Sequence, residues 1–326
     1  MDMENENYMI IKKKYIYSLL ILAFFIFLFI LSNKIDQKRR NNDRIKKINS
    51  INSIEMNNSY QKCYITLANL KIIHLIISRF LIEFYFSNEF PKKLYEKDYI
   101  LNGIRVMKKY LLPSLENQIC KNFTWILMLG NKANITYIKS LINFNNSFSV
   151  KIIYQKDIKN YVRNITKGFD ILITTRIDYD DIIYYDAVND VRKAINIHKP
   201  LLLYGYKRGI YYFESDKNYY DFYRNYKNKG CMSIFVSLII VLNKVNDTVI
   251  VYDLIGHIRI REKLLKLYKK WGLQKLDYEP SVFDSGDPKF VWVRQKYSGS
   301  FQESQNKNKI LKININKFNL NKFYGK

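Results

Sequence analysis

The chain has 326 residues, 48% of them hydrophobic and 25% charged, so it can bury a core and is not disordered throughout. Its 54 Lys and Arg residues against 29 Asp and Glu give a net charge of +25, which is typical of proteins that bind nucleic acid or anionic membranes. The chain also has an excess of residues with A/T-rich codons, with 34 Asn against 5 Ala, and lysine is such a residue, so a biased genome is another explanation of the charge. The three cysteines are far apart in the sequence, which excludes a disulfide scaffold and a CxxC metal knuckle.

The first predicted element is the uncharged apolar segment Tyr15–Ser32. As a helix it spans roughly 27 Å, which is close to the hydrocarbon thickness of a bilayer. A cleaved signal peptide is the alternative, but the apolar run is long for one and no clear small-x-small cleavage site follows it. We therefore expect a single transmembrane anchor that follows a short tail, residues 1–14.

Two opposing signals leave the orientation of this anchor open. Seven basic residues follow the span closely and three precede it, which favours a cytoplasmic C-terminal part. Six Asn-x-Ser/Thr acceptors favour the opposite side and a glycoprotein; they are Asn57, Asn122, Asn134, Asn145, Asn164 and Asn246. The expected localisation is a single-pass membrane protein that faces the ER or Golgi lumen in a eukaryote and is associated with the cytoplasmic membrane otherwise.

A stem and a folded domain are predicted after the anchor. Residues 33–62 are polar and predict the stem, residues 63–300 the domain, and residues 301–326 a basic, poorly ordered tail. The expected strands are Ile72–Ile77, Phe123–Leu129, Val150–Tyr154, Asp170–Thr175, Leu201–Tyr204, Val249–Tyr252 and Phe290–Val293. Cys231–Leu242 is too short for a membrane span and predicts a buried core element.

Three helices are predicted between these strands. Apolar spacing from Leu101 to Leu111 predicts the first, which Pro113 ends or kinks. Tyr184–Ile197 predicts the second, and His257–Trp271 predicts a basic amphipathic third. This alternation indicates an α/β domain with a mostly parallel sheet, helices on both faces, and ligands at the carboxyl ends of the strands.

Three carboxylates directly follow one predicted strand: Asp178, Asp180 and Asp181. If the chain stays extended there, Asp178 and Asp180 project to one side, and Asp181 can cap a helix that begins near Ile182. Gathered carboxylates are hard oxygen ligands for Mg²⁺ or Mn²⁺, and such an ion would neutralise a leaving diphosphate. The alternative interpretation is a solvated acidic turn.

Neighbouring side chains are candidates for the same site. Arg79 and Arg176 can either hold the aspartates in ion pairs or bind phosphate oxygens. His257 can reach a metal or act as a base, and Trp292 can stack on a sugar or a nucleoside, although an aromatic strand is more often core. His74, inside a predicted strand, is expected to be a satisfied core residue.

Seven motifs occur in an order that is informative as a set. They are HLIISRF (His74–Phe80), Arg105 with LPSLENQ, FTWILML, ITTRIDYDD, LYGYKRG, SIFVSLI and VWVRQKYSGS. Over about residues 72–300 this order resembles the putative rhamnosyltransferase family, a group of GT-A glycosyltransferases. The resemblance implies a GT-A-like nucleotide-sugar-binding fold with Asp178, Asp180 and Asp181 as its D-x-D-type element.

The resemblance also implies roles for single residues. Asp180 and Asp181 are the catalytic candidates, and a Mn²⁺ or Mg²⁺ ion is expected on Asp178, Asp180, Asp181 and His257. Donor contacts are expected from Arg79, Arg105, Arg176, Tyr206 and Trp292. The family often has a His-Gly pair near the last strand, where this chain has Tyr297-Ser298-Gly299, so His257 or water is left to supply that metal contact.

Three hypotheses about function follow. The first is a membrane-anchored, metal-dependent glycosyltransferase that moves a sugar, with rhamnose suggested by the family, from a nucleotide-diphosphate donor to a glycan or lipid-linked acceptor. The second is an inactive relative that serves as a scaffold, and the third is a basic membrane protein that binds polyanions. No nucleic-acid-binding module is recognisable, so nucleic acid is not an expected partner. P-loop, G-x-G-x-x-G, H-E-x-x-H and G-x-S-x-G motifs do not occur.

Overall fold

The computed structural model describes residues 70–82, 94–142, 147–214, 217–223, 235–245, 247–254, 260–272, 281–283, 288–294 and 323. The predicted anchor Tyr15–Ser32 and the stem lie outside these residues, as do His257 and Tyr297-Ser298-Gly299. Within the part of the chain that is described, no helix combines the length and the apolar character needed to cross a bilayer.

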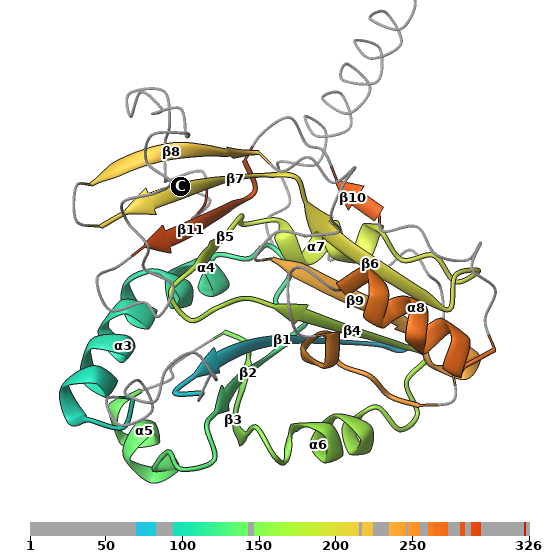
Figure 1. The fold of residues 1–326 in the computed structure, drawn as a ribbon, viewed down its shortest axis with the longest axis horizontal. Helices are drawn as coiled ribbons and strands as arrows, with labels where there is room; N and C mark the ends of the chain where they lie inside the picture. Colours follow the sequence, from blue (N-terminus) through green and yellow to red (C-terminus); the bar gives the residue numbers. More distant parts are fainter. Residues whose placement is uncertain are drawn as a thin grey trace, which may run out of the picture. The chain divides into compact units, whose positions relative to one another are not determined.

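The larger of two sheets has seven strands in the described part of the chain, in the order β10-β6-β9-β4-β1-β2-β3 (Figure 1). These strands are β1 (Ile72–Phe80), β2 (Thr124–Leu129), β3 (Ser149–Tyr154), β4 (Ile171–Arg176), β6 (Leu201–Tyr206), β9 (Val236–Val241) and β10 (Ser281–Phe283). Strand β9 runs antiparallel to β4 and β6, and the other neighbouring pairs are parallel. The prediction of a mostly parallel α/β sheet is confirmed.

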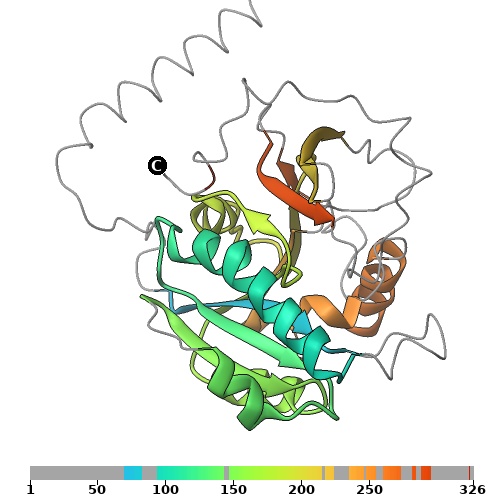
Figure 2. The same cartoon turned by 90° about the vertical axis from the view of Figure 1, so that its left-hand side faces the viewer.

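Both faces of the large sheet are buried, which is why its strands are apolar at successive rather than alternate positions. On one face Ile76 and Phe80 of β1 pack in a core with residues of α3, α4, α5 and α7. On the other face Leu75 and Ile77 pack with residues of α6 and α8, and Figure 2 shows α3 and α8 on opposite sides of the sheet. The helices are α3 (Lys97–Lys109), α4 (Leu111–Glu116), α5 (Ile135–Leu141), α6 (Ile158–Ile165), α7 (Ala187–Lys193) and α8 (Ile260–Lys270).

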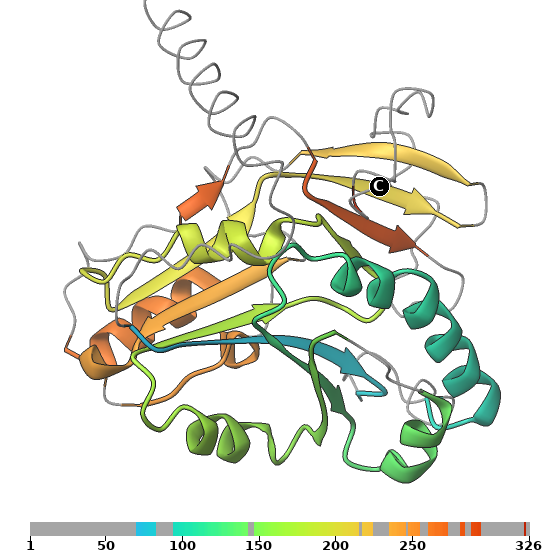
Figure 3. The same cartoon turned by 180° about the vertical axis from the view of Figure 1, so that it is seen from behind.

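A smaller sheet has the described strand order β5-β11-β7-β8. Its strands are β5 (Ile182–Ile183), β7 (Arg208–Phe213), β8 (Asn218–Tyr223) and β11 (Phe290–Arg294). Only Lys207 separates β6 from β7, so the chain passes directly from one sheet to the other (Figure 3). Val106 and Tyr110 of the α3 region share a core with this sheet, so α3 packs against elements of both sheets.

Some local predictions are wrong. Val249–Tyr252 does not pair as a strand: Val251–Leu254 forms the 3₁₀ helix η2, which docks on the sheet because the Val251 N–H donates to Thr174 Oγ1 at 2.9 Å. The predicted first helix breaks at Tyr110, and Pro113 lies in the first turn of α4, where its missing N–H has no helical partner.

One residue of the predicted C-terminal tail, Phe323, is buried. Phe323 is 2% exposed, packs in the core of the small sheet, and meets the Tyr184 ring edge-on at 6.0 Å between centroids. The prediction of a poorly ordered tail is therefore wrong at this residue.

Candidate functional site

The register of two parallel strands builds the site. In the pairing of β1 with β4, Ile77 lies opposite Arg176, and the Ile177 N–H continues this ladder by donating to the Ile77 carbonyl at 3.1 Å. Arg79 follows Ile77 by two residues and Asp178 follows Arg176 by two residues, so Arg79 lies beside Asp178. The site is thus at the carboxyl ends of central strands, where open α/β sheets bind their ligands.

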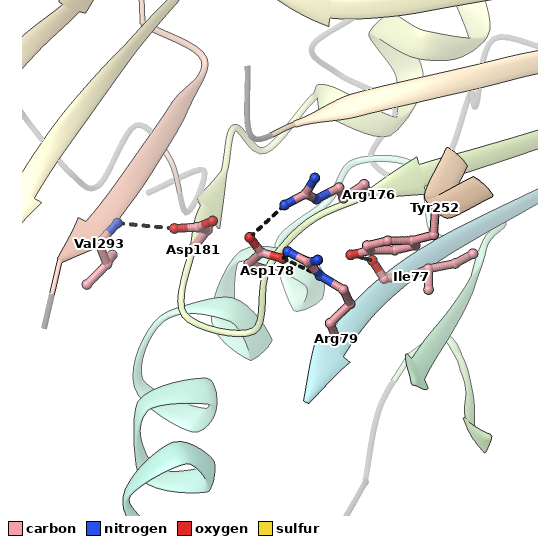
Figure 4. Close-up of polar contacts among 7 residues, drawn as sticks. All are labelled: Ile77, Arg79, Arg176, Asp178, Asp181, Tyr252 and Val293. Carbon is pink, nitrogen blue, oxygen red and sulfur yellow. Dashed lines mark hydrogen bonds and ion pairs between the residues drawn. The ribbon is translucent and has the colours of Figure 1, made fainter. Parts of the chain in front are cut away.

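Two arginines hold Asp178 between them (Figure 4). Arg79 donates from Nε at 3.2 Å and from Nη2 at 3.0 Å to Oδ1, and Arg176 Nη2 donates to Oδ2 at 3.2 Å. The exposed fractions of the side chains are 14% for Arg79, 8% for Arg176 and 23% for Asp178. We call these three residues the arginine clamp. Charge-assisted bonds of this kind are stronger than neutral ones, and burial protects them from screening.

Tyr252 of η2 lies beside both arginines. The guanidinium carbons of Arg79 and Arg176 are 5.1 and 5.5 Å from its ring centroid, within the range of cation–π attraction. Its hydroxyl donates to the Ile77 carbonyl at 3.2 Å. Burial raises the pKa of Tyr252 although the charge of Arg79 opposes that rise, so the hydroxyl stays protonated and remains a donor.

Arg176 keeps its charge in this buried position. Burial lowers the pKa of Arg176, but Asp178 and Tyr252 raise it by more, so the net shift is upward. Its Nε is buried, and no residue in the described part of the chain accepts a hydrogen bond from it. One donor of the clamp therefore has no partner among the described residues.

The acidic segment after β4 is a turn, so the expectation of an extended chain is wrong. The Asp181 N–H donates to the Asp178 carbonyl at 3.2 Å. The fully buried Asp181 turns away from the clamp, and its Oδ1 accepts from the Val293 N–H of β11 at 3.2 Å (Figure 4). Ile182 begins β5 and not a helix, so the predicted helix cap at Asp181 is wrong: this carboxylate joins the turn to the small sheet.

The turn is also packed against α3. The Tyr179 ring meets Phe80 edge-on at 5.1 Å between centroids. A Cβ atom at Gly103 of α3 would lie 2.5 Å from the Phe80 ring and 3.7 Å from Tyr179, so α3 can approach only because Gly103 lacks a side chain. Asp180 is 8% exposed, and after burial its charge is the largest cause that raises the pKa of Tyr179.

The predicted metal ligands do not form a cation site in this arrangement. Both oxygens of Asp178 bind arginines, Asp181 binds the Val293 N–H, and His257 lies outside the described residues. Where side chains are described, no group of three His, Cys, Asp or Glu residues could hold a metal ion.

The other predicted donor contacts lie elsewhere. Arg105 is on the exposed face of α3 and donates to Asn102 Oδ1 at 2.6 Å. Tyr206 is 1% exposed and donates to Asp190 Oδ2 at 3.1 Å. Trp292 belongs to β11, but its side chain is outside the described part. Of the predicted donor contacts, Arg79 and Arg176 are brought together, and the roles of all five in binding stay predictions.

Sequence reasoning missed Tyr252 as a site residue. It follows the apolar residues Val249, Ile250 and Val251, a run that is typical of a strand. No local pattern marks a tyrosine that will lie beside two arginines, one of them in β1, so only the three-dimensional structure reveals it.

A family model matches part of the chain. Residues 82–240 match the model of the family described as Putative rhamnosyl transferase. The matched segment is similar to this family and makes up 159 of the 326 residues. The match confirms the resemblance inferred from the motifs and the prediction of a glycosyltransferase. Of the clamp, Arg176 and Asp178 lie within the matched segment, and Arg79 precedes it.

Several solved structures are similar to the chain at low identity. HddC from Yersinia pseudotuberculosis is 14% identical, with 69% of this chain and 90% of that chain covered and a TM-score of 0.30. The inositol-1-phosphate CTP transferase from T. maritima is 11% identical, with coverages of 68% and 88% and a TM-score of 0.31. A putative nucleotide-diphospho-sugar transferase from Desulfovibrio desulfuricans is 12% identical, with coverages of 69% and 81% and a TM-score of 0.32. No curated protein matches the chain.

Proposed function

We propose that this glycosyltransferase binds the diphosphate of a nucleotide-sugar donor at the arginine clamp and transfers the sugar to a hydroxyl group of a glycan or lipid-linked acceptor. The observation that carries the proposal is the convergence of Arg79 and Arg176 on Asp178 at the carboxyl ends of β1 and β4. Guanidinium groups match phosphate oxygens in geometry, and two of them offset the charge that develops on a leaving diphosphate.

In the proposed reaction one bond forms and one bond breaks. The acceptor oxygen forms a bond to the anomeric carbon, the bond from that carbon to the diphosphate oxygen breaks with its electron pair, and the hydroxyl proton goes to a base. Asp178 orients the two arginines in this scheme. Asp180 and Asp181 stay the predicted catalytic residues, and the bond from the Val293 N–H gives Asp181 a structural role as well.

No divalent ion is assigned to this scheme, because both oxygens of Asp178 already accept hydrogen bonds from arginines and Asp181 accepts from the Val293 N–H. The GT-A-like assignment is supported by the order of the motifs together with a mostly parallel sheet whose candidate site is at the carboxyl ends of its strands. Rhamnose as the transferred sugar is supported by the description of the matching family.

We also propose that the segment Tyr15–Ser32 anchors the enzyme and that the domain faces an oxidising compartment, such as the lumen of the ER or Golgi. Cys120 is disulfide-bonded, and disulfides persist mainly outside the cytosol. Asn122, Asn134 and Asn164, the three acceptor asparagines within the described residues, are exposed. A loss of mass after endoglycosidase treatment would test this orientation.

The test of activity is a screen of donors with the full-length chain in detergent. Nucleotide release is measured with a panel of nucleotide sugars, including rhamnose donors, with and without Mn²⁺ and with lipid-linked acceptors. We expect release from one class of donor, and a loss of at least about tenfold in Arg79→Met, which corresponds to about 1.4 kcal/mol of transition-state stabilisation. Arg163→Met is the matched control, because Arg163 lies in an exposed pair with Asp247. Equal release from Arg79→Met and the control would contradict the proposal.

A further inference from the structure

A cavity lies at the end of the large sheet opposite the arginine clamp. It has a volume of about 540 Å³ and opens where β1, β2 and β3 begin, with His74, Lys121, Phe123, Phe148 and Phe169 among its lining residues. From His74 to Arg79, β1 advances five residues, or roughly 17 Å at about 3.3 Å per residue. The cavity is therefore separate from the arginine clamp.

Three buried nitrogen atoms lie without a hydrogen-bond partner at this cavity or beside it. They are His74 Nδ1, Lys121 Nζ and Arg192 Nε, and no residue in the described part of the chain pairs with any of them. His74 is 2% exposed and Arg192 is 5% exposed. Buried polar groups in proteins are nearly always paired, so three such atoms in one neighbourhood indicate a missing partner, and Lys121 Nζ and Arg192 Nε, which can only donate, need an acceptor.

The surrounding contacts show why these particular atoms stay unpaired. His74 Nε2 is 2.7 Å from Thr175 Oγ1, which is itself 2.7 Å from Ser237 Oγ, so Nδ1 is the ring nitrogen that stays unpaired. Arg192 Nη2 donates to the carbonyl of Asn122, a residue of the cavity wall, which leaves Nε. The charge of Arg192 also acts on His74, so these two residues are electrostatic neighbours.

The electrostatics of the three groups agree with a missing anion. Burial lowers the pKa of His74 well below its usual value, and the charge of Arg192 lowers it further. Burial lowers the pKa of Lys121 against the opposing charge of Glu116, and burial lowers the pKa of Arg192. Burial thus disfavours the charged form of all three groups, and an anion beside them would favour it.

The rest of the lining is suited to the body of an organic molecule. Phe123 and Phe148 stack with centroids 4.9 Å apart, and Phe169 lines the same cavity. The volume falls within the range of small-molecule sites and far exceeds that of a single inorganic ion.

We propose that this cavity binds a small organic anion. Its phosphate or carboxylate group accepts hydrogen bonds from His74 Nδ1, Lys121 Nζ and Arg192 Nε, and its apolar or ring portion packs against the phenylalanines. The site is independent of the proposed donor site, so the failure of either proposal leaves the other intact.

The test is a titration of the full-length protein in detergent with phenyl phosphate, benzoate, inorganic phosphate and uncharged phenol, each against a blank of micelles. Binding is measured by calorimetry and by the NMR shift of the His74 imidazole protons. We expect phenyl phosphate or benzoate to saturate and to move the His74 signal, and the arm that saturates identifies phosphate or carboxylate as the preferred group. Phenol and inorganic phosphate should bind at least tenfold more weakly.

Variants locate the binding. Lys121→Met should weaken the preferred anion at least tenfold, Lys121→Arg should retain it, and Arg163→Met, in an exposed ion pair outside both sites, should leave the affinity unchanged. The proposal is overturned if neither organic anion saturates, if Lys121→Met binds as well as the unaltered protein, or if Arg163→Met abolishes binding. Should Lys121→Met fail to fold, the His74 signal of the unaltered protein decides: an unmoved signal under a saturating anion overturns the proposal.

Discussion

Arg79 and Asp178 are 99 residues apart in the chain, yet Arg79 Nη2 lies 3.0 Å from Asp178 Oδ1. They meet because β1 and β4 are parallel neighbours with Ile77 opposite Arg176. A shift of one residue in this register would turn one of the two side chains to the other face of the sheet. The candidate donor site is therefore as well defined as the pairing of the two central strands.

The first prediction concerns this pair. In a double-mutant cycle of Arg79→Met and Asp178→Asn, we expect a coupling of about 1–3 kcal/mol in the free energy of unfolding, because both side chains are largely buried. Urea denaturation measures it. The control is the exposed pair Arg163–Asp247, where a coupling below about 1 kcal/mol is expected. Equal coupling in the two cycles would show that burial adds nothing to the Arg79–Asp178 pair.

The second prediction separates structure from catalysis at Asp181. Asp181→Ala leaves the buried Val293 N–H without its acceptor and should lower the free energy of unfolding by about 1–3 kcal/mol, whereas Asp181→Asn keeps a side-chain oxygen and most of the stability. Thermal unfolding and nucleotide release are measured on both variants. If Asp181→Asn is stable and still active, Asp181 has a structural role only, and a stable variant without activity would support the predicted catalytic role. Unchanged stability in Asp181→Ala would contradict the structural role.

The third prediction concerns the contact between α3 and the acidic turn. In Gly103→Ala the added Cβ atom would lie 2.5 Å from the Phe80 ring, and relief of this clash should cost about 1–3 kcal/mol of stability. Lys108→Ala, at an exposed position of the same helix, is the control and should change stability by less than about 0.5 kcal/mol. Adding Phe80→Leu to Gly103→Ala should recover part of the loss. Without such recovery, the clash is not the cause.

The parts of the fold that could be predicted are those in which a local run of apolar residues indicates a buried strand. Strands β1, β2, β4 and β6 are apolar at successive positions because helices cover both faces of the sheet. The carboxyl-end location of the site follows from the same alternation of strands and helices. One of the two interpretations of the arginines, an ion pair with an aspartate, is seen directly in the clamp.

The parts that could not be predicted depend on contacts between distant residues. Strand β5 has two residues, and it is a strand only because Ile182 and Ile183 pair with Val291 and Phe290. The hydroxyl of Tyr252 reaches the Ile77 carbonyl across 175 positions. The residues of β7 and β8, rich in tyrosine and interrupted by polar residues, give no clear period, so these strands were missed.

The fourth prediction is a pH dependence of stability that originates at His74. Burial lowers the pKa of His74 in the folded protein well below its usual value near 6.5. Between the two pKa values the unfolded chain therefore binds a proton that the folded protein does not. The contribution of His74 to the free energy of unfolding is therefore fully present above about pH 6.5. It falls as the pH drops below this value, by at most about 1.4 kcal/mol per pH unit for one proton.

His74→Gln tests this assignment, because the side-chain amide can still pair with Thr175 Oγ1 but does not titrate. Urea denaturation of both proteins at pH 7.5, 6.5, 5.5 and 5.0 gives two curves in which the titration of carboxylates is shared and cancels in the difference. We expect the loss of stability below pH 6.5 to be smaller in His74→Gln, whereas His198→Gln, at an exposed position, should follow the unaltered protein. Parallel curves for the unaltered protein and His74→Gln would mean that His74 takes up its proton equally in the folded and the unfolded protein. That result would contradict the prediction, because burial beside Arg192 should hinder protonation of His74 in the folded protein.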